Sequence, residues 1–308
     1  MPADISIIIP LYNKEKFILD TLRSVYLQDI SNWECIIVDD GSTDMGLELV
    51  YEFISTHPAK WKVLPIKNGG QTKARNLGIK AAVGRYLAFL DADDLWVPDK
   101  LSKQFKFLEA NPAVSGVLSG YAIFHSNSKL IRVVNGKNFE RLLRRWSNMR
   151  GFGGGLESVG MVRHNLNSDK FFFDETLSTS SGLDFTLNFA RNGEMKLLNN
   201  IGMLYRLSEG QWHTNSDELK RNSTLISKKH SSYLKENLNE SHQHYYYWIE
   251  VRKHGYPYLA HAILKDLFRF RLARLQMLYW LLSRNIKALF LGLYHRKFVR
   301  EQLLFLKG

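Results

Sequence analysis

The chain of 308 residues is 45% hydrophobic and 23% charged, which is enough apolar material for a large buried core and excludes a disordered tail protein. Its one cysteine, Cys35, excludes an internal disulfide, and the formal net charge of +12 favours anionic partners. The N-terminus has no signal-peptide pattern and no uncharged apolar run is long enough to span a membrane, so we expect a cytoplasmic protein.

Short β-rich runs alternate with helical patterns in the N-terminal part of the chain. Strands are predicted at 5–9, 35–38, 61–66 and 86–90, and Pro10 is expected to end the first. Apolar residues at helical spacing predict helices near 17–26, 47–54 and 72–83. This alternation is typical of βαβ units with right-handed crossovers, and so predicts an α/β fold with a doubly wound, mainly parallel sheet.

The rest of the chain is less regular. A strand is predicted at 130–134, a basic helix at 138–149, a Gly-rich run at 151–155 and an amphipathic helix at 183–191, ended by Asn192-Gly193 as a C-cap. Beyond residue 218 helix formers dominate and aromatic residues cluster. We therefore predict two parts, an α/β domain at 1–215 and a smaller, basic, aromatic-rich helical region at 216–308.

Polar clusters follow each of the first four predicted strands. They lie at 12–14, 39–42, 67–70 and 91–94. One such cluster alone is an ordinary turn or helix cap. Ligands of doubly wound sheets bind beyond the carboxyl ends of the strands, so four clusters at one edge predict a ligand site there.

Asp91 and Asp93 are candidates for binding a hard cation. Two residues apart in extended backbone, their side chains project to the same side, and Mg²⁺ or Mn²⁺ needs only one or two protein carboxylates when phosphate completes its shell. The alternative is that these aspartates act as caps or ion-pair partners. Asp94 points the other way and is expected to order the turn before Pro98.

Four motifs in this part of the chain resemble those of family 2 glycosyltransferases of the GT-A fold. They are SIIIPLYN at 6–13, VDDGSTD at 38–44, ARNLG at 74–78 and LDADD at 90–94, in the order and spacing of that family. A weaker likeness follows at 172–177 and 184–187, where the acceptor half of such enzymes is expected. Beyond about residue 215 the sequence shows no family motif.

The resemblance implies inverting transfer of a sugar from a UDP-sugar to an acceptor hydroxyl, with Mn²⁺ or Mg²⁺ as cofactor. It implies that the ring of Tyr12 packs on the base and that Asp40 accepts the imide N–H of uracil, which cytosine lacks. Asp93 would bind the metal that bridges the diphosphate, and Asp91 would orient the ribose or the metal's waters. The remaining residues implied at the donor site are Pro10 in the nucleoside pocket and Asn68 and Arg75 near ribose and diphosphate.

The sequence departs from the family at the catalytic base. Inverting transfer needs a carboxylate that removes the acceptor proton, and the family's Glu-Asp pair reads Ser181-Gly182 here. The candidates left are Asp184 and, after the Gly-rich run, Glu157. On a helix two residues correspond to about 200° of rotation, so Asp184 reaches the acceptor only where the backbone is not yet helical. Its alternative role is an N-cap or a helix-face charge.

A second departure concerns 205–213, where many relatives carry a His at the position of Ser208. His213 is the nearest substitute, as a third metal ligand or a phosphate contact. Its alternative is an exposed interdomain histidine.

The C-terminal region concentrates positive charge, with twelve Lys and Arg against two acidic residues between 251 and 308. Interleaved with Leu, Phe, Tyr and Trp, this pattern favours peripheral contact with anionic lipid at the inner face of the cell membrane. A saccharide or polyprenyl-linked saccharide acceptor of surface polysaccharide synthesis would then be close by. The alternative is a helical bundle that packs on the catalytic domain. No nucleic-acid partner is expected, because no recognised motif accompanies the charge.

Two rival functions remain open. A scaffold protein that binds nucleotide-sugars but has lost its base is suggested by Ser181-Gly182. A nucleotidyltransferase is the less favoured rival, because the first strand is followed by Leu11 to Lys14 rather than by a Gly-rich basic loop.

Overall fold

The computed structural model describes residues 3–125, 130–134, 157–164, 171–177, 180–207, 221–222, 225–226 and 228–232. The predicted basic helix at 138–149, the Gly-rich run at 151–155, His213 and most of the 216–308 region lie outside the described residues. Of Glu157 only the backbone is described.

The N-terminal part forms the predicted βαβ units. Its elements are β1 (Ile5–Leu11), α1 (Ile18–Tyr26), β2 (Trp33–Asp39), α2 (Gly46–Thr56), β3 (Lys60–Pro65), α3 (Gln71–Ala81) and β4 (Tyr86–Phe89). The four strands are all parallel and lie in the order β3-β2-β1-β4. Because β1 and β2 are buried on both faces, their sequences are continuous apolar runs rather than alternating ones.

Pro10 does not end the first strand as predicted, since β1 continues to Leu11 and Pro10 pairs with Val38 of β2. The ladder between β1 and β4 covers only Ile5 to Ile8, and the Leu90 N–H donates to the Ile8 carbonyl just beyond it. The missing N–H of Pro10 therefore faces a position where β4 has already ended, which is where a sheet tolerates proline.

The second half of the sheet mixes strand directions. It contains β5 (Leu95–Trp96), β6 (Val114–His125), β7 (Leu130–Val134), β8 (Gly160–Arg163) and β9 (Glu194–Leu207), with helix α4 (Lys100–Ala110) after β5 and a short 3-10 helix, η1 (Glu157–Val159), before β8. The order continues from β4 as β8-β6-β9-β5, with β7 paired to β6. The predicted strand at 130–134 is confirmed, whereas the two longest strands, β6 and β9, were not predicted.

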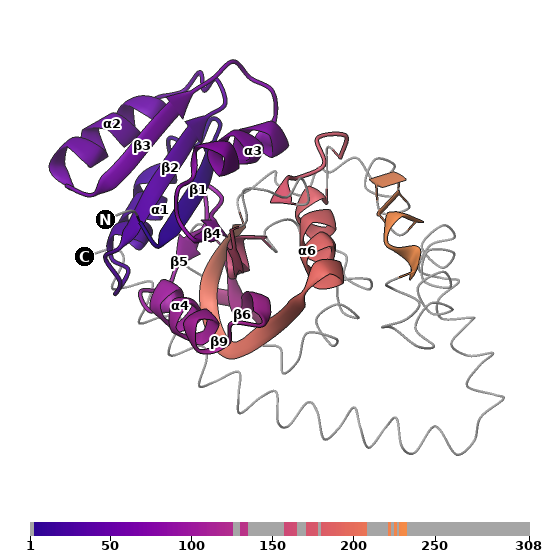
Figure 1. Ribbon diagram of the computed structural model, residues 1–308. Coiled ribbons are helices and arrows are strands. Elements are labelled where there is room, and N and C mark those ends of the chain that lie inside the picture. Colours follow the sequence, from indigo (N-terminus) through magenta and orange to yellow (C-terminus); the bar gives the residue numbers. More distant parts are fainter. Residues whose placement is uncertain are drawn as a thin grey trace, which may run out of the picture.

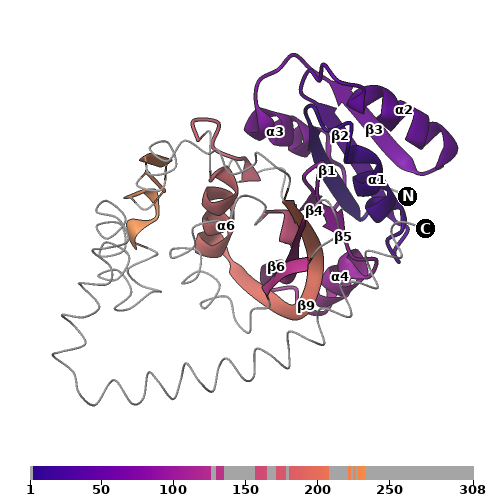
Figure 2. The ribbon, with the colours of Figure 1, turned by 180° about the vertical axis from the view of Figure 1, so that it is seen from behind.

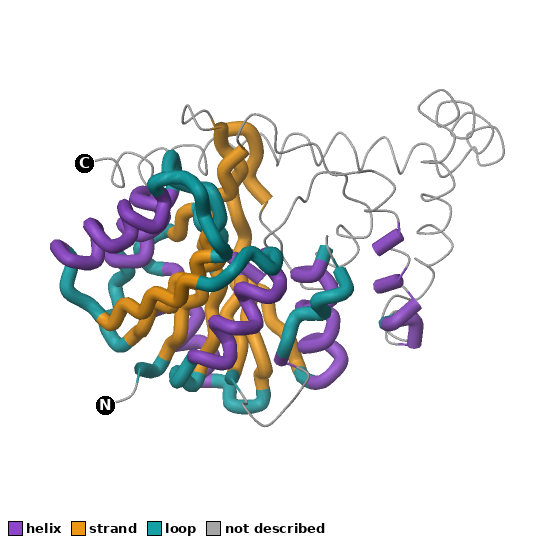
Figure 3. Tube along the Cα trace, turned by 90° about the horizontal axis from the view of Figure 1, so that it is seen from above, coloured by secondary structure: helices purple, strands orange, loops and turns teal. Residues whose placement is uncertain are grey.

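Helices cover both faces of the N-terminal strands. Helices α1 and α2 pack together on one face, and α3 contacts β1 and β2 from the other (Figures 1 and 3). Viewed from behind, β6 and β9 curve beside α6 (Ser181–Asn192) (Figure 2). The crossover direction changes between β1 and β4, so the switch point of the sheet lies between these two strands, and in sheets of this kind ligands bind in a crevice at that point.

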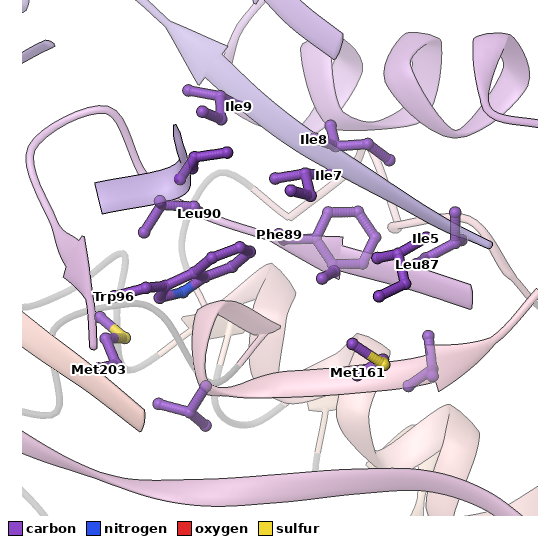
Figure 4. Close-up of a cluster of buried hydrophobic side chains, with 14 of the residues drawn as sticks. Ile5, Ile7, Ile8, Ile9, Leu87, Phe89, Leu90, Trp96, Met161 and Met203 are labelled. Carbon is purple, nitrogen blue, oxygen red and sulfur yellow. The ribbon is translucent and has the colours of Figure 1, made fainter. Parts of the chain in front are cut away.

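One core joins the two halves of the sheet. Ile7, Leu87 and Phe89 of the parallel strands face Trp96, Met161 and Met203 of the mixed half (Figure 4), and all belong to one cluster of buried side chains. Because the core is continuous, the polar loops at the strand ends are held on a rigid base.

Helix α6 begins two residues earlier than predicted, at Ser181 rather than at 183. Gly193 is the C-cap residue, as predicted, but its backbone is extended (φ −178°) and not left-handed. A Cβ at Gly193 would lie 1.7 Å from Ser115 Oγ, so close packing on β6 explains this glycine.

Candidate active site

The turn after β4 carries Asp91, Asp93 and Asp94. The Asp94 N–H donates to the Asp91 carbonyl over 3.0 Å, so the backbone is a tight turn and not the extended chain that we assumed. Two distant elements hold it. The hydroxyl of Thr21, from α1, lies 2.9 Å from the Asp94 carbonyl oxygen, and Arg206 Nε, from β9, donates to the Asp93 carbonyl over 2.8 Å. The acidic turn is therefore fixed before any ligand binds.

Asp91 is held by α3. Arg75 Nη2 lies 2.5 Å from Asp91 Oδ1, and Gln71 Nε2 lies 3.0 Å from the same oxygen. The Arg75 side chain is only 3% exposed, and its guanidinium carbon lies 5.3 Å from the centre of the Phe173 ring. The structure thus brings Arg75 and Asp91 together at the crevice, as an ion pair.

Asp93 pairs with Lys14, from the loop after β1. Lys14 Nζ lies 2.6 Å from Asp93 Oδ2, and the Asp93 side chain is 7% exposed. Burial raises the pKa of Asp93; Lys14 opposes this shift and the charge of Asp91 adds to it, so that the net shift is upward. Asp91 and Asp93 are therefore close enough for their charges to interact, yet each has its own cation.

Asp94 has a different environment. Burial, with the charges of Asp93 and Asp91, raises the pKa of Asp94 well above its ordinary value. Its Oδ1 accepts a hydrogen bond of 2.8 Å from the backbone N–H of Arg206. This contact ties Asp94 to β9, and the expected role of Asp94 in ordering the turn before Pro98 stays a prediction.

Asp40, directly after β2, holds the loop that follows β3. Its Oδ1 accepts the Gly69 N–H over 2.7 Å and its Oδ2 accepts the Gly70 N–H over 2.8 Å. Each carboxylate oxygen keeps a second lone pair, so these contacts leave capacity for a further N–H donor. The predicted contact between Asp40 and uracil stays a prediction.

The loops after β2 and β3 approach each other closely at Gly41. Its φ is +72°, and a Cβ there would lie 3.0 Å from the Asn68 backbone nitrogen, so glycine is required. Asn68 and Tyr12 are both exposed, Tyr12 by 46%, whereas Pro10 is buried within β1. Of the two residues predicted to line the nucleoside pocket, only Tyr12 presents an open surface.

A reciprocal set of hydrogen bonds ties the loop after β1 to the loop after β2. Asn13 Oδ1 accepts the Thr43 N–H over 2.8 Å. Asp44 Oδ2 accepts the Glu15 N–H over 2.9 Å, and Glu15 Oε2 accepts the Met45 N–H over 3.1 Å. These bonds join the two loops that carry Tyr12 and Asp40, directly after two separate strands.

Asp184 lies in the first turn of α6 and is fully buried. His230 Nε2 lies 2.8 Å from its Oδ1, and Lys229 Nζ lies 2.8 Å from its Oδ2. Lys229 also reaches Asp174 Oδ2 over 2.9 Å. Burial lowers the pKa of Lys229, but its hydrogen bonds to Asp184 and Asp174 outweigh burial and raise that pKa overall. Asp184 thus anchors the 228–232 stretch to α6.

The backbone is already helical at Ser181, which affects the prediction that Asp184 is the catalytic base. The condition set for Asp184, a backbone not yet helical, is not met, because α6 already includes Ser181 and Gly182. Ser181 Oγ lies 3.4 Å from Thr72 Oγ1 at the start of α3, next to Gln71, which binds Asp91. Ser181, at the start of α6, therefore lies near the acidic turn, but neither Ser181 nor Gly182 supplies a carboxylate at this position. The catalytic roles of Asp184 and Glu157 stay predictions.

Sequence reasoning did not single out Lys14, Gln71, Lys229 or His230. Lys14 had a usable signal, since it is a cation in a loop at the same sheet edge as two aspartates. Lys229 and His230 had none, because their partner Asp184 is 45 and 46 residues away in the sequence.

The acidic turn suits a divalent cation only together with phosphate. Among the described residues no group of three or more His, Cys, Asp or Glu side chains is arranged to hold a metal ion. Asp91 and Asp93 supply two hard oxygen donors, and Asp93 already binds a cation, the ammonium of Lys14. Mg²⁺ and Mn²⁺ accept one or two protein carboxylates when phosphate oxygens and water complete the shell. The donor set therefore fits such an ion carried in with a diphosphate.

Part of this chain is similar to known proteins. Residues 6–158 match the family described as Glycosyl transferase family 2. An uncharacterized glycosyltransferase of Rickettsia conorii is 47% identical over 107 residues, which are 35% of this chain and 17% of that protein. The UDP-Glc:alpha-D-GlcNAc-diphosphoundecaprenol beta-1,3-glucosyltransferase WfgD of Escherichia coli is 38% identical over 125 residues, 40% of this chain and 48% of that protein.

Among solved structures, S. aureus TarS 1-349 in complex with UDP-GlcNAc superposes with a TM-score of 0.61 at 23% identity. The match covers 74% of this chain and 66% of that one, and it concerns the fold. These findings confirm the predicted GT-A fold. Residues 6–158 of the chain belong to glycosyltransferase family 2. The chain spans less than half the length of the two curated relatives named above.

Proposed function

We propose that the protein transfers a sugar from a UDP-sugar, with inversion, to a hydroxyl of a saccharide or lipid-linked saccharide, using Mn²⁺ or Mg²⁺. The observation that carries this proposal is the acidic turn at the switch point between β1 and β4, where Asp93 pairs with Lys14 of the loop after β1 and Asp91 pairs with Arg75 of α3. The printed activity of WfgD on a diphosphoundecaprenol-linked sugar and the UDP-GlcNAc complex of TarS support the donor and acceptor classes.

Nucleoside recognition is assigned to the loops after β1 and β2. The exposed ring of Tyr12 offers a flat apolar surface to the base, and Asp40 is fixed by Gly69 and Gly70 so that its remaining lone pairs accept the uracil N–H. Because Asp40 is only 2% exposed, a base without that N–H would leave the remaining lone pairs of the carboxylate without a donor, which is costly, and uridine is therefore selected.

Diphosphate binding is assigned to Asn68, Arg75 and the acidic turn. Asp93 and Asp91 would hold the divalent cation, which when bound stabilises the negative charge on the leaving nucleoside diphosphate. Arg75 keeps Asp91 in place through their ion pair of 2.5 Å. The hydrogen bonds of Thr21 and Arg206 to the turn hold both carboxylates in a fixed geometry, which avoids reorganisation during the reaction.

The acceptor side is assigned to the start of α6. Ser181, beside Thr72, offers no base. We keep Asp184 and Glu157 as the candidates for proton removal, and the contacts of Asp184 with Lys229 and His230 favour a positioning role for it. The absence of a carboxylate at Ser181 and Gly182 keeps a binding scaffold without transferase activity as the second candidate function.

The proposed location is the cytoplasmic face of the membrane, where a lipid-linked acceptor would be found. The basic, aromatic-rich sequence from 251 to 308 supports this proposal. In the part of the chain that the structure describes, none of the helices has the length and apolar character needed to cross a bilayer.

A donor screen tests the proposal. The full chain is incubated with UDP-, GDP- and CDP-sugars, each with Mn²⁺ and with EDTA, and released nucleotide is measured. Metal-dependent release of UDP alone is expected, because a transferase slowly hydrolyses its donor without acceptor. Binding of UDP without any turnover would instead favour the scaffold, and preferential release from a GDP- or CDP-sugar would contradict the assignment of Asp40.

A further inference from the structure

The ion pair between Lys14 and Asp93 bridges the crevice where the strand order reverses. Lys14 belongs to the loop after β1 and Asp93 to the turn after β4, and their charged atoms lie 2.6 Å apart. The Lys14 carbonyl accepts the N–H groups of Phe17 and Ile18 at the start of α1, each over 2.9 Å. The backbone of Lys14 is therefore fixed, and only its side chain can move.

The two cations of the acidic turn differ in how easily they can leave. Arg75 is 3% exposed and lies between Asp91 and the Phe173 ring, so its guanidinium has no alternative position in water. Lys14 is 31% exposed and carries its ammonium on a flexible four-carbon stem. The pair of Arg75 and Asp91 is therefore permanent, whereas the pair of Lys14 and Asp93 is exchangeable.

Ionised Asp93 needs a nearby cation, because its side chain is almost completely buried and a buried carboxylate without a partner is costly. A divalent ion and an ammonium compete for the same carboxylate oxygens, since like charges repel strongly at such short range. A diphosphate in the crevice would bring several anionic oxygens within reach of the Lys14 side chain.

We propose that Lys14 is the resident counter-ion of Asp93 in the empty site and that, when donor and divalent cation bind, it releases Asp93 and transfers its ammonium to a diphosphate oxygen. This inference rests on the proposed function and adds a donor-binding residue to it. Lys14 would then have opposite effects on two affinities. It weakens metal binding in the absence of nucleotide and strengthens nucleotide binding in the presence of metal.

The test measures Mn²⁺ binding to the full chain without nucleotide by electron paramagnetic resonance, and UDP binding at saturating Mn²⁺ by calorimetry. In Lys14→Met, Mn²⁺ should bind about three- to tenfold more tightly and UDP about three- to tenfold more weakly, as expected for a partly buried charge pair. Lys16→Met is the matched control, because Lys16 is an exposed lysine two residues away and its loss changes the net charge equally. It should change neither affinity by more than about twofold.

Lys14→Arg keeps the charge and should retain the weak Mn²⁺ binding of the wild type. Thermal unfolding verifies that each variant is folded. If the wild type binds UDP in a metal-dependent way but Lys14→Met binds Mn²⁺ no more tightly, the inference is overturned while the proposed function stands. If UDP affinity is the same with Mn²⁺ and EDTA and Lys14→Met abolishes it, Lys14 replaces the metal permanently, which also overturns the exchange. Failure of the wild type to bind UDP at all would overturn the proposed function itself.

Discussion

Replacing Asp184 by Asn separates the two roles that this residue can have. The substitution keeps the shape of the side chain and removes the charge that meets Lys229 and His230, each at 2.8 Å. It also places an amide group where both partners donate hydrogen bonds. We expect Asp184→Asn to destabilise the protein, because the buried contacts of Asp184 hold the 228–232 stretch on α6.

The magnitude follows from these contacts. A hydrogen bond to a charged group contributes about 1.5–3 kcal/mol, and the Lys229 side chain, at 39% exposure, recovers part of this from water. A net loss of about 2 kcal/mol should lower the melting temperature by roughly 4–8 °C for a domain of this size. A positioning role should reduce turnover less than about tenfold, whereas loss of a general base costs roughly 10²- to 10⁴-fold.

The assay combines thermal unfolding with donor hydrolysis and UDP binding. Asp174→Asn is the matched control, because Asp174 contacts the same Lys229 but has a side chain that is 29% exposed. Its melting temperature should change much less. A turnover loss of about 10²-fold or more in Asp184→Asn, with an unchanged melting temperature, would refute the positioning role and restore Asp184 as the base. Glu157→Gln then tests the other candidate.

Four further predictions concern the donor site and the acid sensitivity of the fold. Asp93→Ala should remove most of the difference in UDP affinity between Mn²⁺ and EDTA in a calorimetric titration, and a difference that persists would contradict the metal assignment. Wild type should bind UDP at least about tenfold more tightly than CDP, and Asp40→Asn should reduce that preference, because a buried acceptor is left unpaired only against cytosine. Gly41→Ala should cost about 1–2 kcal/mol in urea unfolding, because its φ is +72° and its Cβ would crowd Asn68; a neutral effect would show that this loop adapts. Hydrogen bonds from the Thr176 hydroxyl and from Lys229 hold the pKa of Asp174 below its ordinary value of 3.8. The stability that Asp174 contributes is therefore present above pH 3.8, and it is lost as the pH falls through the lower pKa of the folded state. Lys229→Met should therefore show a smaller loss of stability over that acid range when melting temperature is followed against pH.

The sequence by itself predicted the first half of the sheet, which the structure confirms, and a donor site at the ends of its strands, which stays a prediction. Strands such as β1 and β2 are buried on both faces, so their apolar runs stand out against the polar loops between them. Parallel strands connected by helices all end at the same edge, which is why the order of strands and helices along the chain was enough to assign the clusters around Asp40 and Asp91 to one site. Three of the four family motifs carry the same information, because they consist of these strand ends, whereas ARNLG at 74–78 lies within α3.

Only the tertiary structure decided how the charges of that site are paired. Asp93 meets Lys14, 79 residues away, and Asp184 meets His230, 46 residues away, and no local pattern encodes either contact. The long strands β6 and β9 were missed for a related reason: β6 is buried along nearly all of its length and pairs with three other strands, so its sequence shows neither alternation nor a clear turn. Local sequence sets which backbone segments can form, whereas the partner of each buried charge is set by which segments the folded sheet brings together.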